Sequence, residues 1–175
     1  MRLKGKRVLI LVEEHYEDLE LHYPRLRLRE EGAEVVVGGT GKPAYSGKRG
    51  TTAKPDADVK ELRAEDFDGV VIPGGWAPDK LRISPAVLRL VRDLNKLRRP
   101  IAAICHAGSV LVSADVVRGR RVTSYVSVAD DLRLAGAEWV DAPVMVDGNL
   151  VTSRVPEDLP DFCRELITQL ERPPR

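Results

Sequence analysis

The stretch Ala102-Ala103-Ile104-Cys105-His106-Ala107-Gly108 (AAICHAG) places one of the chain's two cysteines directly before one of its three histidines. The apolar run Ile101–Ile104 precedes this pair, and Gly108 and further apolar residues follow it. Such an order is typical of a buried parallel strand that turns sharply into a helix, with Cys105 at the turn. Because backbone N–H groups at a helix start stabilise an anion, we expect the pKa of Cys105 to be lowered and its thiolate to be nucleophilic.

Two other interpretations of the Cys-His pair remain open at this point. A cysteine after an apolar strand is most often a small buried hydrophobe, and the dipeptide alone favours that interpretation. A metal site is a poor alternative, since adjacent residues seldom close on one ion and no further Cys/His set has ligand spacing. Cys163 has no polar cluster around it in the sequence, so we interpret it as a packing residue.

Composition excludes several classes of protein. The chain has 175 residues, 43% hydrophobic and 31% charged, with a net charge of +1. These values predict one globular domain over residues 1–175, and the balanced charge argues against nucleic-acid binding. No apolar run approaches the ~20 residues of a membrane span, and the first residues lack the apolar segment of a signal peptide. We therefore expect a cytoplasmic protein with reduced thiols and no membrane association.

Short apolar runs alternate with longer amphipathic ones along the whole chain, which predicts a βαβ architecture with a mostly parallel sheet. A kink or restart is expected at Pro24, within the first helix. Asp147-Gly148 predicts a hairpin turn near the end of the chain. The expected strands cover 7–12, 34–37, 69–72, 101–104, 122–124, 144–146 and 150–152, and the expected helices cover 18–31, 84–97, 108–114, 130–135 and 157–170.

Polar residues follow three of the expected strands, and ligands of open parallel sheets bind at the carboxyl ends of their strands. The first strand leads into residues 13–18 (EEHYED), the third into Pro73-Gly74-Gly75, and the fourth into Cys105-His106. The sequence therefore predicts that an acidic segment, a glycine turn and the Cys-His pair meet at one edge of the sheet.

These segments also carry a family resemblance. EDLELHYPRLRLREEG (17–32), VVIPGGWAPDKLR (70–82), AAICHAG (102–108), RVTSY (121–125), AGAEWVD (135–141) and VDGNLVTSRVPEDL (146–159) resemble the PfpI family of intracellular cysteine proteases and deglycases. That family belongs to the ThiJ/PfpI superfamily of class I glutamine amidotransferase-like proteins. The match runs in order from Val8 to about Leu170. It implies a flavodoxin-like three-layer sandwich with a nucleophile elbow after a central strand.

The resemblance also implies roles for individual residues. Cys105 is the nucleophile, His106 is the base, and Glu17 approaches the sulfur and shares a proton with it. Asp79 stands where the family has an acidic residue that orients the histidine across a subunit contact; many members have glutamate there, and an alternative role for Asp79 is a helix N-cap.

Around the expected nucleophile, the amides of Gly74, Gly75 and His106 are candidates for an oxyanion hole, although the glycines also suit a tight turn. Tyr125 matches a pocket tyrosine of the family, and Trp76 is expected to wall the site or to pack at a subunit contact. Ala107-Gly108 departs from the Gly-Pro that is common after the family's Cys-His pair.

Three functions are compatible with these residues. The first is a cysteine-dependent hydrolase or lyase acting on small carbonyl compounds or glycated proteins and peptides, with at most weak peptidase activity. The second is a stress-response redox sensor or holdase chaperone that uses an oxidisable Cys105 without turnover. The third is a scaffold that only retains the fold. The resemblance further implies a homodimer or homohexamer with the active site at subunit contacts, and it requires no cofactor and no metal.

Overall fold

A seven-stranded sheet forms the centre of the protein in the computed structural model, which describes residues 1–172. The strand order is β10-β11-β7-β6-β1-β2-β5, and every neighbouring pair is parallel except the hairpin of β10 and β11. The mostly parallel sheet that the sequence predicts is confirmed. The sheet strands are β1 (Arg7–Leu11), β2 (Glu34–Gly39), β5 (Ala57–Asp58), β6 (Gly69–Ile72), β7 (Ile101–Ile104), β10 (Val144–Asp147) and β11 (Leu150–Ser153).

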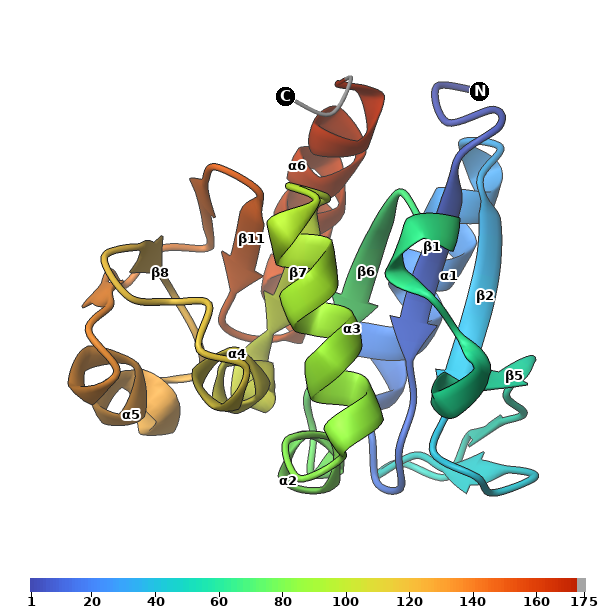
Figure 1. Ribbon diagram of the computed structural model, residues 1–175, viewed down its shortest axis with the longest axis horizontal. Coiled ribbons are helices and arrows are strands. Elements are labelled where there is room, and N and C mark those ends of the chain that lie inside the picture. The colour runs from blue at the N-terminus through green and yellow to red at the C-terminus, as the bar shows by residue number, and fades with distance from the viewer. Residues whose placement is uncertain (173–175) are drawn as a thin grey trace.

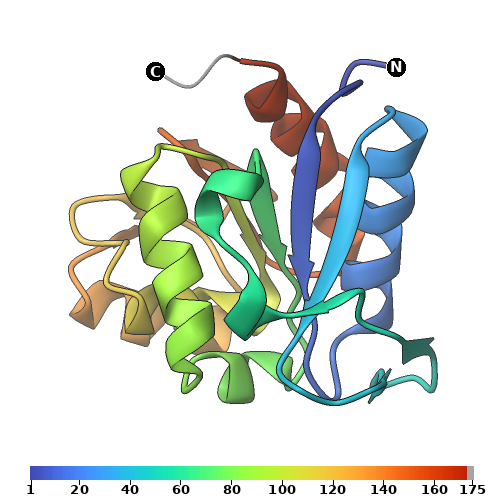
Figure 2. The same ribbon diagram turned by 45° about the vertical axis from the view of Figure 1, so that its right-hand side comes forward.

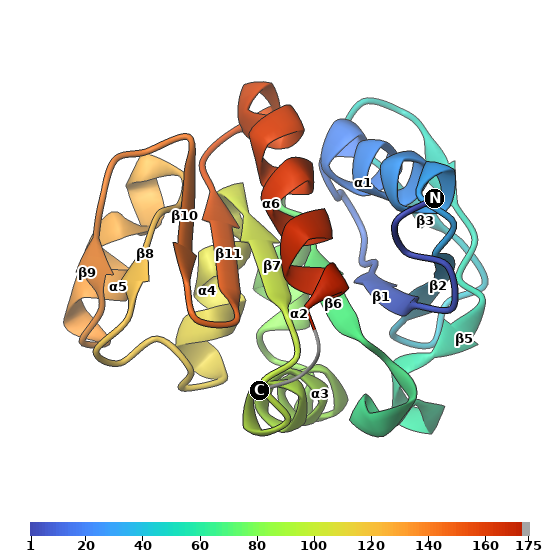
Figure 3. The ribbon, with the colours of Figure 1, turned by 90° about the horizontal axis from the view of Figure 1, so that it is seen from above.

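Helices cover both faces of this sheet, so the expected three-layer sandwich is confirmed (Figure 1). Helices α1 and α6 pack side by side on one face, and α3 covers the other, as the view from above shows (Figure 3). The helices are α1 (Asp18–Glu30), α2 (Ala77–Leu81), α3 (Pro85–Lys96), α4 (Gly108–Ser113), α5 (Ala129–Leu134) and α6 (Leu159–Glu171).

Smaller elements lie outside the central sheet, most of them at its two sides (Figure 2). Two short two-stranded sheets pair β3 with β4 and β8 with β9. The strand expected at 122–124 is shifted, because β8 ends at Val122 and pairs with β9. These elements are β3 (Tyr45–Ser46), β4 (Thr52–Ala53), β8 (Arg121–Val122), β9 (Glu138–Trp139) and the 3-10 helices η1 (Val59–Glu61), η2 (Ala64–Asp66), η3 (Cys105–Ala107), η4 (Val126–Val128) and η5 (Pro156–Asp158).

Local sequence accounts for the main elements. Strands β6 and β7 are buried at every residue, as continuous apolar runs covered on both faces should be. The Ser84 hydroxyl accepts from the Val87 amide and caps α3, and Pro85 occupies its first position. Gly148 has a φ of +56° at the turn of the β10–β11 hairpin. The restart expected at Pro24 is wrong: α1 runs unbroken through this buried proline.

The topology brings three loops together. Strands β7, β6 and β1 are neighbours in the sheet and run parallel. The loops at their carboxyl ends contain Cys105, the Pro73-Gly74-Gly75 turn and the segment before α1, respectively. The candidate residues therefore converge at one edge of the sheet. Within residues 1–172, none of the helices has the length and apolar character required to span a bilayer.

Candidate active site

Cys105 lies at a strained turn between β7 and α4. Its φ is +61°, a left-handed conformation that costs a residue with a Cβ about 1–2 kcal/mol. The three residues of η3 carry the chain from the strand into α4, and the Tyr125 amide donates to the Cys105 carbonyl at 3.1 Å. The nucleophile elbow that the sequence predicts is therefore present. Strain of this kind persists where the surrounding structure holds a side chain in a functional position.

His106 turns back toward the sulfur of its neighbour. Its Nδ1 atom lies 3.3 Å from the Cys105 Sγ, within hydrogen-bond distance. The imidazole stacks on the Tyr125 ring with 4.8 Å between centroids, and the Trp76 ring lies 5.9 Å away on centroids. His106 is thus oriented by two aromatic rings, and it lies where it can take the thiol proton.

The carboxyl group next to Cys105 belongs to Glu20, and the expectation that it belongs to Glu17 is wrong. Glu20 is fully buried, and its Oε2 accepts from the Gly74 amide at 2.7 Å. The Glu20 carboxyl and the Cys105 thiol shift each other's pKa, and the other carboxyl oxygen, Glu20 Oε1, is buried with no hydrogen-bond partner among the described residues. Glu17 precedes the first turn of α1 and pairs instead with Arg49 Nε at 3.2 Å and Lys48 Nζ at 3.7 Å.

Burial shifts the pKa of both Glu20 and Cys105 upward. It raises the pKa of the Glu20 carboxyl to about 8, so this carboxyl is protonated at neutral pH. Burial and the Glu20 charge raise the pKa of the Cys105 thiol to about 12, although the amides of His106 and Gly75 lower it in part. The expected lowering of the Cys105 pKa is therefore wrong, because desolvation of a residue that is 9% exposed outweighs two amides. Activation of the sulfur requires a proton acceptor.

The environment of His106 suits that role. Burial and the Lys48 charge lower its pKa, and the charge of Asp79 opposes them, so the imidazole is neutral at pH 7. Asp79 lies exposed on α2, and within the described chain no hydrogen bond joins it to His106. Its expected role as an N-cap is also wrong, since α2 begins after Trp76. The Nε2 atom of His106 instead lies 3.3 Å from Ser127 Oγ.

The two glycines of the turn have different roles. The Gly74 amide donates to Glu20, so it does not serve as a free oxyanion donor. A Cβ on Gly74 would lie 2.6 Å from Glu20 Oε2 and 2.8 Å from Cys105 Cβ, so the close approach leaves no room for a side chain there. The Gly75 and His106 amides both hydrogen-bond the sulfur. The expected oxyanion hole therefore loses the Gly74 amide, and the Gly75 and His106 amides are directed at the sulfur itself.

Replacing Gly75 by alanine is expected to destabilise the fold by several kcal/mol, whereas Gly119→Ala should cost about 1 kcal/mol. Both glycines have left-handed backbones, with φ of +74° and +71°. A Cβ on Gly75 would lie 2.4 Å from the Glu17 amide nitrogen and 2.5 Å from the His15 carbonyl oxygen, while at Gly119 nothing lies within 4 Å. Chemical denaturation of the two variants measures the difference; equal losses would show that the close approach of the two loops is unimportant.

Three residues of the site were not predicted from the sequence. Glu20 and Ser127 contact the sulfur and the imidazole as described above. Lys48 places its Nζ 5.4 Å from the centroid of the Trp76 ring and beside Glu17. The spacing of Glu17 and Glu20, about one helical turn apart, is the signal that points to Glu20 as a second candidate. Within residues 1–172, no group of three or more His, Cys, Asp and Glu side chains could hold a metal.

The chain also matches a known protein family over most of its length. The family model described as DJ-1/PfpI family matches residues 6–169. The chain belongs to the DJ-1/PfpI family. The resemblance seen in the sequence is thereby confirmed.

Family relatives match the chain over most of its length. An uncharacterised protein of Archaeoglobus fulgidus is 50% identical over 95% of this chain and 99% of its own length. The deglycase PfpI of Pyrococcus furiosus is 41% identical, over 94% of this chain and 99% of its own length.

Solved structures of the DJ-1/PfpI family share the fold. DJ-1beta of Drosophila melanogaster is 32% identical with a TM-score of 0.88, over 95% of this chain and 90% of that one. A protein of Anabaena variabilis with DJ-1/ThiJ/PfpI-like and ferritin-like domains is 40% identical with a TM-score of 0.92. The match covers 95% of this chain and 48% of that protein. The flavodoxin-like sandwich is thus confirmed.

Proposed function

We propose that this member of the DJ-1/PfpI family is a cysteine-dependent enzyme that acts on small carbonyl compounds or on glycated side chains. The observation that carries the proposal is the juxtaposition of Cys105 with His106 Nδ1 at 3.3 Å and with the buried Glu20 carboxyl. Relatives from Pyrococcus abyssi and Pyrococcus furiosus are named deglycases, which supports the same chemistry.

The reaction begins at a neutral thiol. His106 Nδ1 removes the proton from Cys105 as the sulfur attacks the carbonyl carbon, which gives a tetrahedral adduct bound through sulfur. The Glu20 carboxyl, protonated below pH of about 8, stabilises the sulfur as its charge develops. His106 then returns the proton to the adduct oxygen, which gives a hemithioacetal on sulfur. With a 2-oxoaldehyde such as methylglyoxal, transfer of the C1 hydrogen to C2 as a proton converts the hemithioacetal into a thioester, and water hydrolyses this thioester to a 2-hydroxy acid and the free thiol. With a glycated amine in the hemiaminal form, the sulfur replaces the amine at this carbon: the C–N bond breaks as His106 protonates the departing amine, and the same hemithioacetal results.

Substrate size follows from the burial of the nucleophile. Cys105 is 9% exposed and is flanked by His106, whose ring contacts those of Trp76 and Tyr125. A small carbonyl compound or a single modified side chain therefore fits better than an extended peptide, and peptidase activity is proposed as weak.

Self-association is a further part of the proposal. Two apolar side chains beside the site are largely exposed, with Trp76 at 57% and Val126 at 67%. A homodimer or homohexamer that covers them would bury these apolar side chains and exclude water from the surroundings of His106. Light scattering of the purified protein tests this directly: a monomer at micromolar concentration would refute it.

The pH dependence of turnover tests the proposed chemistry. The value of kcat/KM for methylglyoxal or a methylglyoxal-glycated amino acid should rise as His106 loses its proton below pH 6.5 and fall as Glu20 ionises near pH 8. Ionised Glu20 opposes negative charge on the sulfur, which gives the alkaline decrease. An enzyme that used a free thiolate would instead gain activity up to about pH 9. No turnover of either substrate would refute the function.

A further inference from the structure

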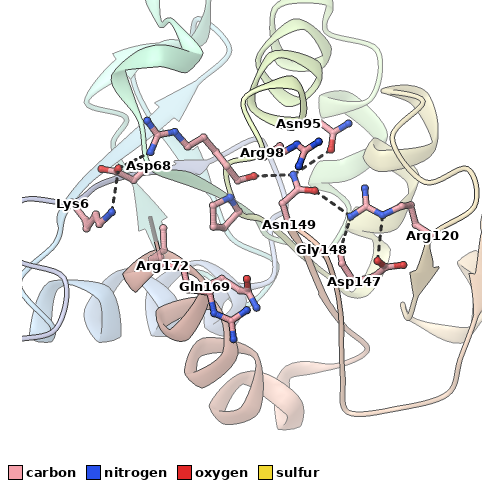
Figure 4. Close-up of a pocket in the computed structure, with 13 residues that line it drawn as sticks. Lys6, Asp68, Asn95, Arg98, Arg120, Asp147, Gly148, Asn149, Gln169 and Arg172 are labelled. Atoms are coloured by element: carbon pink, nitrogen blue, oxygen red, sulfur yellow. Dashed lines mark hydrogen bonds and ion pairs between the residues drawn. The ribbon is translucent and has the colours of Figure 1, made fainter. Parts of the chain in front are cut away.

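A cavity lies at the opposite edge of the sheet from Cys105. Its volume is about 530 Å³, and it is formed where β1, β6, β7 and β11 begin and where α3 and α6 end (Figure 4). This size falls within the range of about 300–1,000 Å³ that is usual for small-molecule sites. The mechanism proposed above uses none of its residues. Five cationic side chains line it: Lys6, Arg98, Arg99, Arg120 and Arg172.

The cavity concentrates positive charge. Its five cations face two carboxylates, Asp68 and Asp147, whereas the whole chain has a net charge of only +1. Asp68 pairs with Lys6 at 3.6 Å and Arg99 at 3.0 Å. Asp147 pairs with Arg120 at 3.6 Å. The two carboxylates are thus engaged by three of the cations.

The Arg98 side chain has no such partner. Within residues 1–172 its guanidinium makes neither an ion pair nor a hydrogen bond, although it borders the cavity. Its φ is +55°, at the left-handed position after α3 where glycine is favoured. Glycine adopts this conformation without strain, so the backbone of the turn gives no reason for an arginine at position 98.

The helix dipoles do not account for the excess charge either. Helices α3 and α6 end at the cavity, and each carboxyl end carries about half a negative charge. Among residues 1–172, these helix ends and the two carboxylates still leave the five cations without full compensation. A bound anion would supply the missing negative charge.

We propose that this cavity binds a small organic phosphate with more than one negative charge. Arginine presents paired N–H donors that match phosphate oxygens. Lys6 and Arg120 lie at opposite ends of the group with Asn149 between them, which suits a molecule with separated anionic oxygens (Figure 4). The Asn95 and Gln169 amides, also on the lining, provide polar contacts for an uncharged part of the ligand.

Calorimetry on the full chain at low salt, with ADP, pyrophosphate and adenosine as probes, tests this proposal. ADP and pyrophosphate should bind and adenosine should not, and Arg98→Gln should weaken binding about tenfold, as loss of one charge-assisted contact would. Arg63→Gln is the matched control, since Arg63 has a 70% exposed side chain outside the cavity. Arg63→Gln should leave the affinity for ADP and pyrophosphate unchanged.

The opposite results would overturn the proposal. These are no binding of either phosphate at millimolar concentration, equal binding of adenosine, or equal weakening by both arginine variants. Unfolding of the variants without ligand should match the wild type, because both side chains are exposed. Cys105→Ala should bind the probes normally, so the outcome is independent of whether the proposed carbonyl chemistry is correct.

Discussion

Replacing Cys105 by alanine is expected to reduce turnover of methylglyoxal or of a glycated amino acid to the uncatalysed rate, a loss of about 10³-fold or more. The reason is that the Cys105 sulfur is the nucleophile placed beside His106 Nδ1, at 3.3 Å. Without the sulfur, His106 has no thiol proton to remove and no covalent adduct forms. The measurement is consumption of substrate by the purified protein, with release of free amine as the second readout.

Cys163→Ala is the matched control for this loss. Cys163 is also a free, buried thiol whose pKa is raised to about 12 by burial. It lies in α6, among core residues. Its replacement should leave kcat/KM unchanged and cost about 1 kcal/mol of stability. Equal activity of the Cys105 and Cys163 variants would contradict the proposed function.

Replacing Glu20 by glutamine is expected to remove much of the pH dependence of stability between pH 4.5 and 8. The folded-state pKa of Glu20 is about 8, against an ordinary value of 4.5. The folded protein therefore binds the Glu20 proton more tightly than the unfolded chain does. The contribution of this proton to the unfolding free energy is complete below pH 4.5 and is lost as the pH rises through 8. The change amounts to at most about 5 kcal/mol.

Denaturation of wild type and Glu20→Gln across this pH range measures the effect. As the pH rises towards 8, the unfolding free energy of the wild type should fall relative to that of Glu20→Gln. Glu17→Gln should keep most of the wild-type slope, because it retains the buried Glu20 carboxyl. It removes the pairing with Lys48 and Arg49 and the Glu17 charge, which raises the pKa of Glu20 less than burial does. Parallel curves for wild type and Glu20→Gln would show that this carboxyl is not held protonated.

The sheet, the elbow and the meeting of three loops could be predicted from sequence because they depend on local pattern. Ile101–Ile104 is apolar throughout, as is typical of a short parallel strand buried on both faces. Ser84-Pro85 and Asp147-Gly148 likewise fix a helix start and a turn through their own chemistry.

The details of the site could not be predicted in this way. Choosing between Glu17 and Glu20 requires knowing in which direction each side chain points at the start of α1. Glu17 has an extended backbone and lies before the first helical turn, whereas Glu20 lies within that turn. The sign of the Cys105 pKa shift depends on how deeply the elbow is buried, which a strand-turn-helix pattern does not specify. Ser127 contacts His106 only because η4 follows Tyr125 around the imidazole.

Alkylation of Cys105 by iodoacetamide as a function of pH, in a Cys163→Ala background, tests most directly whether Glu20 controls the sulfur. The midpoint should lie above the ordinary thiol pKa of 9.0 and should fall by about one unit or more in Glu20→Gln, with no change in Glu17→Gln. A midpoint near neutral pH, or a shift in Glu17→Gln without one in Glu20→Gln, would contradict the conclusion that burial and the Glu20 carboxyl together raise the pKa of Cys105.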